Sequence, residues 1–132
     1  MQKNFYKNIK GKRILITGNT GFVGSYLSLT LNLLGAKILG YSLKIKNKNF
    51  LSNNVKYKNK VKTIEDDISN INRHIKKIRK FKPQIIIHLA SQPLVKESYL
   101  NTLKTYNTNV LGTVNLLEAC RKLRNIKHVL IF

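Results

Sequence analysis

The sequence predicts an α/β domain in which a parallel β-sheet carries helices on both faces. Short apolar segments of strand length alternate along the chain with segments of helical periodicity, and this alternation is typical of parallel sheets. A glycine-rich turn joins the first apolar segment to the first helical one. The chain has 132 residues, 42% of them hydrophobic, which is enough for one domain with its own core.

The first strand and helix are the clearest pair. Residues 13–16 form a β-branched apolar run, as in a buried parallel strand. Residues 22–34 follow as a helix with Leu27, Leu31 and Leu34 at helical spacing, and Gly35 provides its C-cap.

Two further strands are expected over residues 37–41 and 61–64. The polar, Lys/Asn-rich stretch 43–60 between them is predicted to lie on the surface. An acidic cluster, residues 65–67, ends the third strand. Next comes a basic helix in which Ile71, Ile75 and Ile78 share one face, and Lys82-Pro83 ends it.

The strongest strand of the sequence covers residues 85–90. Residues 91–100 are predicted to form a loop and residues 101–122 a long helix with Val110, Val114 and Leu117 pointing inward. Residues 129–131 start a fifth strand, in which the sequence ends. An apolar strand needs neighbours to bury it, so we expect a C-terminally truncated fold whose remaining part lies beyond Phe132.

Chemistry is concentrated in the turn between the first strand and the first helix. Gly18, Gly21 and Gly24 have the spacing G-x-x-G-x-x-G. Gly18 allows a sharp turn, Gly21 lets a pyrophosphate approach the backbone, and Gly24 lets the helix lie close to the strand. The N–H groups of Phe22 and Val23 at the helix N-terminus are the expected phosphate donors. A tight turn without a ligand is the weaker alternative, so we predict a Rossmann-type doubly wound sheet of order 3-2-1-4-5 that binds a dinucleotide.

Two features of this dinucleotide site stay open from the residues alone. The second strand ends in Tyr41-Ser42 rather than in the acidic residue that usually holds the adenosine ribose. Ser42 provides a weaker hydrogen bond, and Lys44 and Lys46 would tolerate a 2′-phosphate, so NAD and NADP are both compatible. Asp67, followed by Ile68, suits an adenine amino group and a helix N-cap equally well.

The sequence resembles the extended short-chain dehydrogenase/reductase family, which acts largely on nucleotide sugars. The resemblance rests on the T-G-x-x-G-F-x-G pattern of residues 17–24, on Asp67-Ile68, on the H-L-A of residues 88–90 and on the T-N-V-x-G-T of residues 108–113. It extends from Gly11 to Phe132 but covers only the first part of the family's length. Segments 21–29, 40–43, 92–99 and 105–118 are most similar to the subfamily of CDP-glucose 4,6-dehydratases.

The resemblance implies NAD as cofactor and a nucleotide sugar as substrate. The NAD-contacting residues that it implies are Thr17, Gly18, Thr20, Gly21, Phe22, Val23, Gly24, Ser42, Asp67, Ile68, Leu89, Ala90, Ser91 and Thr108. Gln92 and Ser98 correspond to the start of the substrate site, and Asn109 to an asparagine that supports the catalytic lysine through water. Asn19 and Ser91 depart from a usual histidine and a usual alanine. Tyr41-Ser42 matches the subfamily, so the missing acid does not argue against NAD.

The implied reaction converts CDP-glucose to CDP-4-keto-6-deoxyglucose without net consumption of NAD. The family's catalytic Ser/Thr, Tyr and Lys are expected beyond Phe132. Residues 1–132 are therefore expected to be an incomplete NAD-binding domain that lacks the substrate domain and is inactive and poorly folded alone. Another nucleotide-sugar epimerase or dehydratase is the nearest alternative. A basic, non-catalytic nucleotide- or RNA-binding module is the alternative from a different class.

The composition sets limits on partners and location. The net charge is +20, but the lysines are scattered among Asn and Ile, without an arginine-rich block or stacking aromatics. We interpret this excess as a compositional bias, with non-specific polyanion binding but no specific nucleic acid. The single Cys120 excludes an internal disulfide and is expected to pack as a small hydrophobe. The sequence has no membrane-span pattern and no signal-peptide pattern, so a cytoplasmic protein is expected, and the family resemblance implies a homo-oligomer.

The three histidines carry weaker expectations. His88, within an apolar strand, is expected to be a packed core residue rather than a chemical one. His74 and His128 are expected at surface or strand-edge positions, and no histidine has metal-ligand spacing, so no metal site is predicted.

Overall fold

A computed structural model describes residues 7–44 and 54–132 and contains one five-stranded parallel sheet. The strands are β1 (Arg13–Thr17), β2 (Lys37–Ser42), β3 (Lys62–Glu65), β4 (Ile85–His88) and β5 (His128–Ile131). Their order is β3-β2-β1-β4-β5, and every neighbouring pair is parallel. The predicted doubly wound sheet and its strand order are confirmed.

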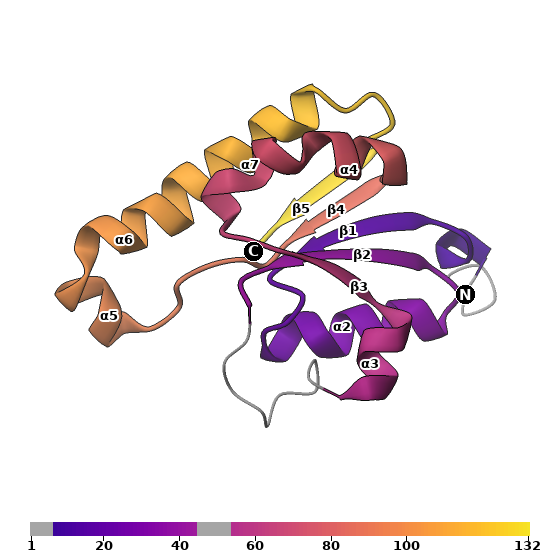
Figure 1. The fold of residues 1–132 in the computed structure, drawn as a ribbon, viewed down its shortest axis with the longest axis horizontal. Helices are drawn as coiled ribbons and strands as arrows, with labels where there is room; N and C mark the ends of the chain where they lie inside the picture. Colours follow the sequence, from indigo (N-terminus) through magenta and orange to yellow (C-terminus); the bar gives the residue numbers. More distant parts are fainter. Residues whose placement is uncertain (1–6, 45–53) are drawn as a thin grey trace.

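Helices cover both faces of the sheet (Figure 1). One face carries α2 (Phe22–Leu33) and α3 (Val55–Lys60). The other carries the 3-10 helix η2 (Ile68–His74), α4 (Ile75–Phe81) and α7 (Gly112–Arg121). The short helices α5 (Val95–Leu100) and α6 (Thr102–Tyr106) extend to one side, and the π-helical turn η3 (Asn107–Leu111) joins α6 to α7.

The core consists of two layers, one on each face of the sheet. Alternate residues of β1 point to opposite layers, since side chains along a strand alternate between faces. Leu15 packs with Ile71, Ile78 and Leu116 on the α4/α7 side. Ile14 and Ile16 pack on the α2/α3 side, in the cluster that contains Leu31 and Tyr57. This burial on both faces explains why β1 is apolar at every position from Ile14 to Ile16.

One sequence prediction of secondary structure is wrong and two are incomplete. Residues 95–100 are helical, although 91–100 were expected to form a loop, and α3 lies within the stretch 43–60 that was expected to be a surface excursion. Both helices have six residues, too few to produce a visible helical period. Residues 45–53 of that stretch lie outside the described residues. The helix predicted around Ile71 begins as the 3-10 helix η2 and becomes α-helical only at Ile75.

The inward face predicted for the long helix is also wrong. Val110, Val114 and Leu117 are 49%, 55% and 45% exposed. The buried residues of α7 are instead Gly112, Leu116 and Ala119. Gly112 allows the close approach, because a Cβ built on it would lie 2.5 Å from Ile68 Cγ2. The helix therefore packs through Gly112, Leu116 and Ala119 and leaves the apolar residues Val110, Val114 and Leu117 exposed.

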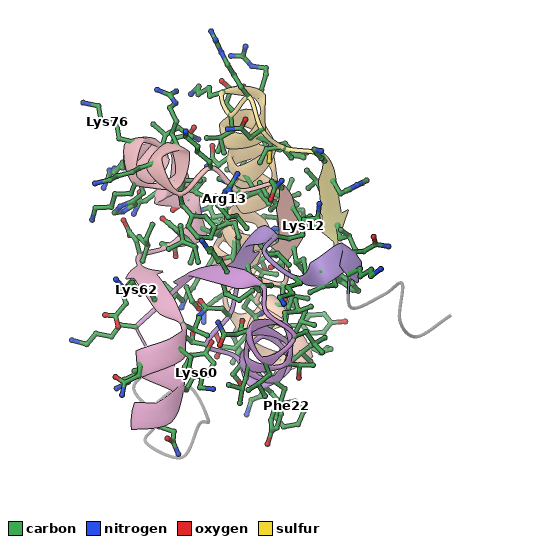
Figure 2. All side chains as sticks on the ribbon, turned by 90° about the vertical axis from the view of Figure 1, so that its right-hand side faces the viewer. Lys12, Arg13, Phe22, Lys60, Lys62 and Lys76 are labelled. Carbon is green, nitrogen blue, oxygen red and sulfur yellow. The ribbon has the colours of Figure 1, made fainter. Side chains whose placement is uncertain are left out.

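Basic side chains are distributed around the molecule rather than gathered in one block. Lys60, Lys62 and Lys76 belong to different elements and project away from the ribbon (Figure 2). Arg13 is an exception, because its Nε donates to the Lys82 carbonyl oxygen at 2.7 Å. No helix of the described residues is long and apolar enough to cross a lipid bilayer.

Candidate cofactor-binding site

A cleft of about 780 Å³ lies at the carboxyl ends of the central strands. Its walls come from the glycine loop, the end of β2, the segment after β3 and the segment after β4. Open α/β sheets bind ligands at this edge, and the volume is typical of small-molecule sites. Every residue that the sequence predicts to contact NAD lines this cleft except Thr17, which is fully buried. Tyr41, Leu43, Lys44, Asp66, Pro93 and Phe132 complete the lining.

The N-terminus of α2 faces this cleft with uncapped backbone. Gly21 is the N-cap residue, its backbone is extended, and no side chain caps the helix. The first turn contains no acidic residue. The first N–H groups of a helix have no partner within the helix and carry its positive dipole end. Phe22 and Val23, both in the cleft lining, thus provide donors suited to a phosphate.

The three loop glycines have separate geometric roles. Gly18 has φ +70°, and a Cβ there would lie 2.8 Å from backbone atoms of Leu89 and Ala90. A Cβ on Gly24 would overlap the Gly18 carbonyl oxygen. A Cβ on Gly21 would meet its nearest neighbour, the same oxygen, only at 3.4 Å. Gly18 and Gly24 are therefore required by the protein's own packing, whereas a Cβ on Gly21, which lines the cleft, would make only an ordinary van der Waals contact.

The end of β2 contributes hydroxyl groups and a cation. The hydroxyl oxygens of Thr20 and Ser42 lie 2.6 Å apart and share a hydrogen bond that ties the loop to β2. Lys44 lines the cleft two residues later. The arrangement of these residues at the end of β2 is compatible with both NAD and NADP.

Two neighbouring carboxylates lie on the opposite wall. Asp67 Oδ1 accepts from the Ser69 N–H at 2.9 Å, so Asp67 is the N-cap of η2. A helix N-cap is one of the two roles that the sequence allows for this residue. Asp66 accepts from Asn70 and lies 2.8 Å from His74 Nε2. The hydrogen bond from Asn70, followed by that from His74, lowers the Asp66 pKa to about 2. The sequence reasoning did not single out Asp66, which is an ionised group in this wall at neutral pH.

Thr17 and His88 form a buried connection below the cleft. Thr17 Oγ1 lies 2.6 Å from His88 Nδ1 and also accepts from the Ala90 N–H at 3.2 Å. His88 Nε2 lies 3.1 Å from Thr113 Oγ1 on α7. Thr17 therefore contacts no ligand space and instead fixes the segment after β4. The prediction that His88 is a core residue is confirmed, since it is 2% exposed.

The buried position of His88 predicts a pH dependence of stability. Burial lowers the pKa of His88 below its ordinary value. Below about pH 6.5 the unfolded chain then binds more protons at this site than the folded one, so the free energy of unfolding falls as the pH falls. Urea denaturation at pH 7.5 and pH 5.5 measures the effect. We expect His88→Asn to remove most of this slope and His128→Asn, at an exposed position, to retain it; equal slopes in both variants contradict the assignment.

Gln92, one of the two predicted substrate residues, and Asn109 form a second network of hydrogen bonds. Asn109 Oδ1 accepts from the Gln92 N–H at 2.7 Å, and Asn109 Nδ2 donates to the Gln92 carbonyl oxygen. The Gln92 side chain bonds Leu94 and Thr105. Ser98 Oγ donates to the Val95 carbonyl oxygen at 2.6 Å. None of Gln92, Ser98 and Asn109 lines the cleft, whereas Thr108, on the same π-helical turn as Asn109, does. Such turns recur at functional sites, but no periodic pattern in the sequence predicts this one.

Two further titratable residues of the described chain, His74 and Cys120, lie in structural positions. The part of the chain that the structure describes contains no group of three or more His, Cys, Asp or Glu residues placed to hold an ion. His74 lies on η2 beside Asp66 and packs edge-on against Tyr41 at 5.7 Å between ring centroids. It was expected at the surface or at a strand edge, but it is partly buried in these contacts. Cys120 is a free thiol packed against the α4/α7 core layer, as predicted.

Comparison with known proteins supports the same reading. A CDP-glucose 4,6-dehydratase of Salmonella typhimurium is 42% identical over 98% of this chain and 35% of that enzyme. A UDP-glucose 4-epimerase of Brucella ovis, solved with NAD, has 30% identity and a TM-score of 0.75 over 92% of this chain and 35% of its own. An epimerase of Methanothermobacter thermautotrophicus shares the fold with a TM-score of 0.82 at 24% identity, over 97% of this chain and 37% of its own.

The chain thus spans about a third of the length of the relatives that it matches. The family model described as GDP-mannose 4,6 dehydratase matches residues 15–132, nearly all of the sequence. The match includes the glycine loop, both carboxylates and the π-helical turn described above. The chain therefore belongs to the GDP-mannose 4,6 dehydratase family of extended short-chain dehydrogenases/reductases.

Proposed function

We propose that this chain forms the NAD-binding part of a nucleotide-sugar 4,6-dehydratase, and that the substrate is CDP-glucose. The observation that carries the proposal is the cleft itself, which brings the glycine loop, Ser42, Asp67-Ile68 and Leu89-Ala90-Ser91 around one space. We further propose that residues 1–132 are an incomplete domain, and that the substrate domain and the proton-transfer residues lie outside them.

The residues present fit a dinucleotide. The uncapped N-terminus of α2 offers N–H groups to a pyrophosphate, and Gly21 lacks the Cβ that would project toward it. Asp67 uses Oδ1 to cap η2. Its second oxygen would suit the adenine amino group, and Ile68, in the cleft lining, would pack on the ring. The segment 89–91 would line the nicotinamide ribose, and Thr108 would contact the cofactor from the π-helical turn.

NAD bound in this cleft would accept a hydride from the sugar and return it within one turnover. The chain's own residues hold and orient rather than transfer protons. The buried Thr17–His88 pair fixes the backbone of Ala90, and Asn109 fixes the backbone of Gln92. Because NAD is not consumed, the enzyme would benefit from keeping NAD bound between turnovers rather than exchanging it. A site with backbone donors and apolar walls suits such tight binding.

The substrate assignment rests on degree of similarity. Identity to the CDP-glucose 4,6-dehydratase is 42%, compared with 33% to a dTDP-D-glucose 4,6-dehydratase of Dictyostelium discoideum. This difference favours the cytidine nucleotide. The single free cysteine among the described residues agrees with the cytoplasmic location that we propose.

The test is an assay of the whole protein that contains this chain with CDP-, UDP-, dTDP- and GDP-linked sugars. We expect CDP-glucose to be preferred, with a product that has lost one water by mass spectrometry and without net formation of NADH. Preference for another nucleotide contradicts the substrate assignment. NADH formed in proportion to product contradicts the reaction.

A nucleotide-sugar 4-epimerase is the second candidate, favoured by the 30% identity to the Brucella ovis epimerase. The same assay separates the two reactions, because an epimerised product keeps the mass of its substrate. RNA binding with a steep salt dependence and no NAD binding would instead identify a basic binding module.

A further inference from the structure

A buried cluster of polar side chains connects the glycine loop to α3 and to the edge strand β3. It consists of Asn19, Tyr57 and Thr63, which come from the loop, from α3 and from β3. Asn19 is fully buried and Tyr57 is 2% exposed. None of the three lines the cleft, so the cofactor site as described does not account for them.

The hydrogen bonds of this cluster hold both the backbone and the side chain of Asn19. Tyr57 Oη donates to the Asn19 carbonyl oxygen at 2.8 Å. Asn19 Nδ2 donates to Tyr57 Oη at 3.1 Å and to Thr63 Oγ1 at 2.9 Å. One tyrosine hydroxyl therefore fixes the peptide group that joins Asn19 to Thr20, inside the phosphate-facing turn.

Gly40 provides the room for this arrangement. It pairs with Ile16 on β1 and with Thr63 on β3, so it lies in the sheet between the loop and the edge strand. A Cβ on Gly40 would overlap the side-chain amide of Asn19. The Asn19 side chain thus lies across β2 over this glycine and reaches Thr63 on the next strand.

We propose that Tyr57 is a positioning residue, which holds the glycine loop through Asn19 in the conformation that binds the NAD pyrophosphate. This inference rests on the proposed function, because it takes NAD binding as the purpose for which the loop conformation is held. Like any tyrosine of ordinary pKa, Tyr57 is protonated at physiological pH and can donate, and burial raises the pKa of its hydroxyl further. The preorganised loop then loses less freedom when the pyrophosphate binds.

Tyr57→Phe tests the role, because it removes the hydroxyl and retains the ring in its core layer. We expect the Kd for NAD, measured by calorimetry on the whole protein, to rise about tenfold. Val61→Ala is the matched control: Val61 is 3% exposed in the same core layer as Tyr57, and its side chain has no polar atom that could join the hydrogen bonds of the cluster. It destabilises the fold but leaves the Kd unchanged. Equal rises in Kd for both variants, or no rise in either, overturn the proposal.

A double-mutant cycle tests the Asn19–Gly40 geometry independently. We expect Gly40→Ala to weaken NAD binding more than about tenfold in the wild-type background, because the new methyl group displaces Asn19. In the Asn19→Ala background the overlap is gone, so Gly40→Ala has little further effect. Additive effects of the two substitutions contradict the arrangement.

Amide hydrogen exchange without NAD separates this inference from the proposed function. We expect Tyr57→Phe to increase exchange across residues 18–24 relative to Val61→Ala. A wild-type protein that fails to bind NAD refutes the proposed function, while the exchange comparison still decides whether Tyr57 holds the loop. Unchanged loop exchange in Tyr57→Phe refutes the positioning role.

Discussion

Replacing Gly24 with alanine is expected to abolish detectable NAD binding and to lower the free energy of unfolding by about 3 kcal/mol. The added Cβ would overlap the Gly18 carbonyl oxygen and lie 2.8 Å from Asn19 Cα. These are backbone atoms, which have no rotamer change available to avoid the contact. The loop must move away from α2, and the pyrophosphate donors move with it.

Gly21→Ala is the contrasting variant. Its Cβ would meet no protein atom closer than 3.4 Å, so we expect the free energy of unfolding to stay near that of the wild type. The methyl group would project toward the pyrophosphate and weaken NAD binding about tenfold or more. Urea denaturation and calorimetric NAD titration measure both quantities. Wild-type stability and affinity in Gly24→Ala would contradict the account of loop packing.

Leu116→Ala is expected to destabilise the chain by about 2–5 kcal/mol, the usual cost of truncating a buried leucine. Leu116 is fully buried where α7 packs on the sheet, in the same layer as Leu15 and Ile86. That loss is a large share of the roughly 5–15 kcal/mol that stabilises a typical domain.

The neighbouring leucine provides the control for this prediction. Leu117 is 45% exposed, so Leu117→Ala should cost less than about 1 kcal/mol. Urea denaturation of the two variants distinguishes the helix faces. A larger loss in Leu117→Ala would mean that α7 packs through the row Val110, Val114 and Leu117 after all.

This helix shows where sequence patterns stop being informative. Two rows on α7 have helical spacing, one of large apolar residues and one that includes Gly112 and Ala119. The large residues suggested the inward face, but the buried row is Gly112, Leu116 and Ala119, and the close approach to Ile68 requires glycine at position 112. The π-helical turn just before Gly112 depends on tertiary packing and leaves no periodic signal.

The sheet, by contrast, could be predicted almost completely. Runs such as Ile14–Ile16 and Ile85–Ile87 are apolar at every position because both faces of the sheet are covered, and this pattern alone identifies central parallel strands. The glycine loop could be predicted equally well, because the spacing of its three glycines between a strand and a helix has a geometric cause. Gly18 and Gly24 have the close backbone contacts that this cause requires.

The networks that hold the site could not be predicted. Thr17 was expected to contact the cofactor but bonds His88, 71 residues away. Tyr57 lies in a stretch that composition marks as surface, and its partner Asn19 is 38 residues distant. Such pairs depend on which strands become neighbours, information that local patterns of one sequence do not contain.

A crystal structure of the whole protein with NAD bound tests the assignment of the cleft as the NAD site. We expect the pyrophosphate to lie against the N–H groups of Phe22 and Val23, and the adenine beside Asp67 and Ile68. NAD in any other position, or a cleft that stays empty at saturating NAD, would contradict this assignment.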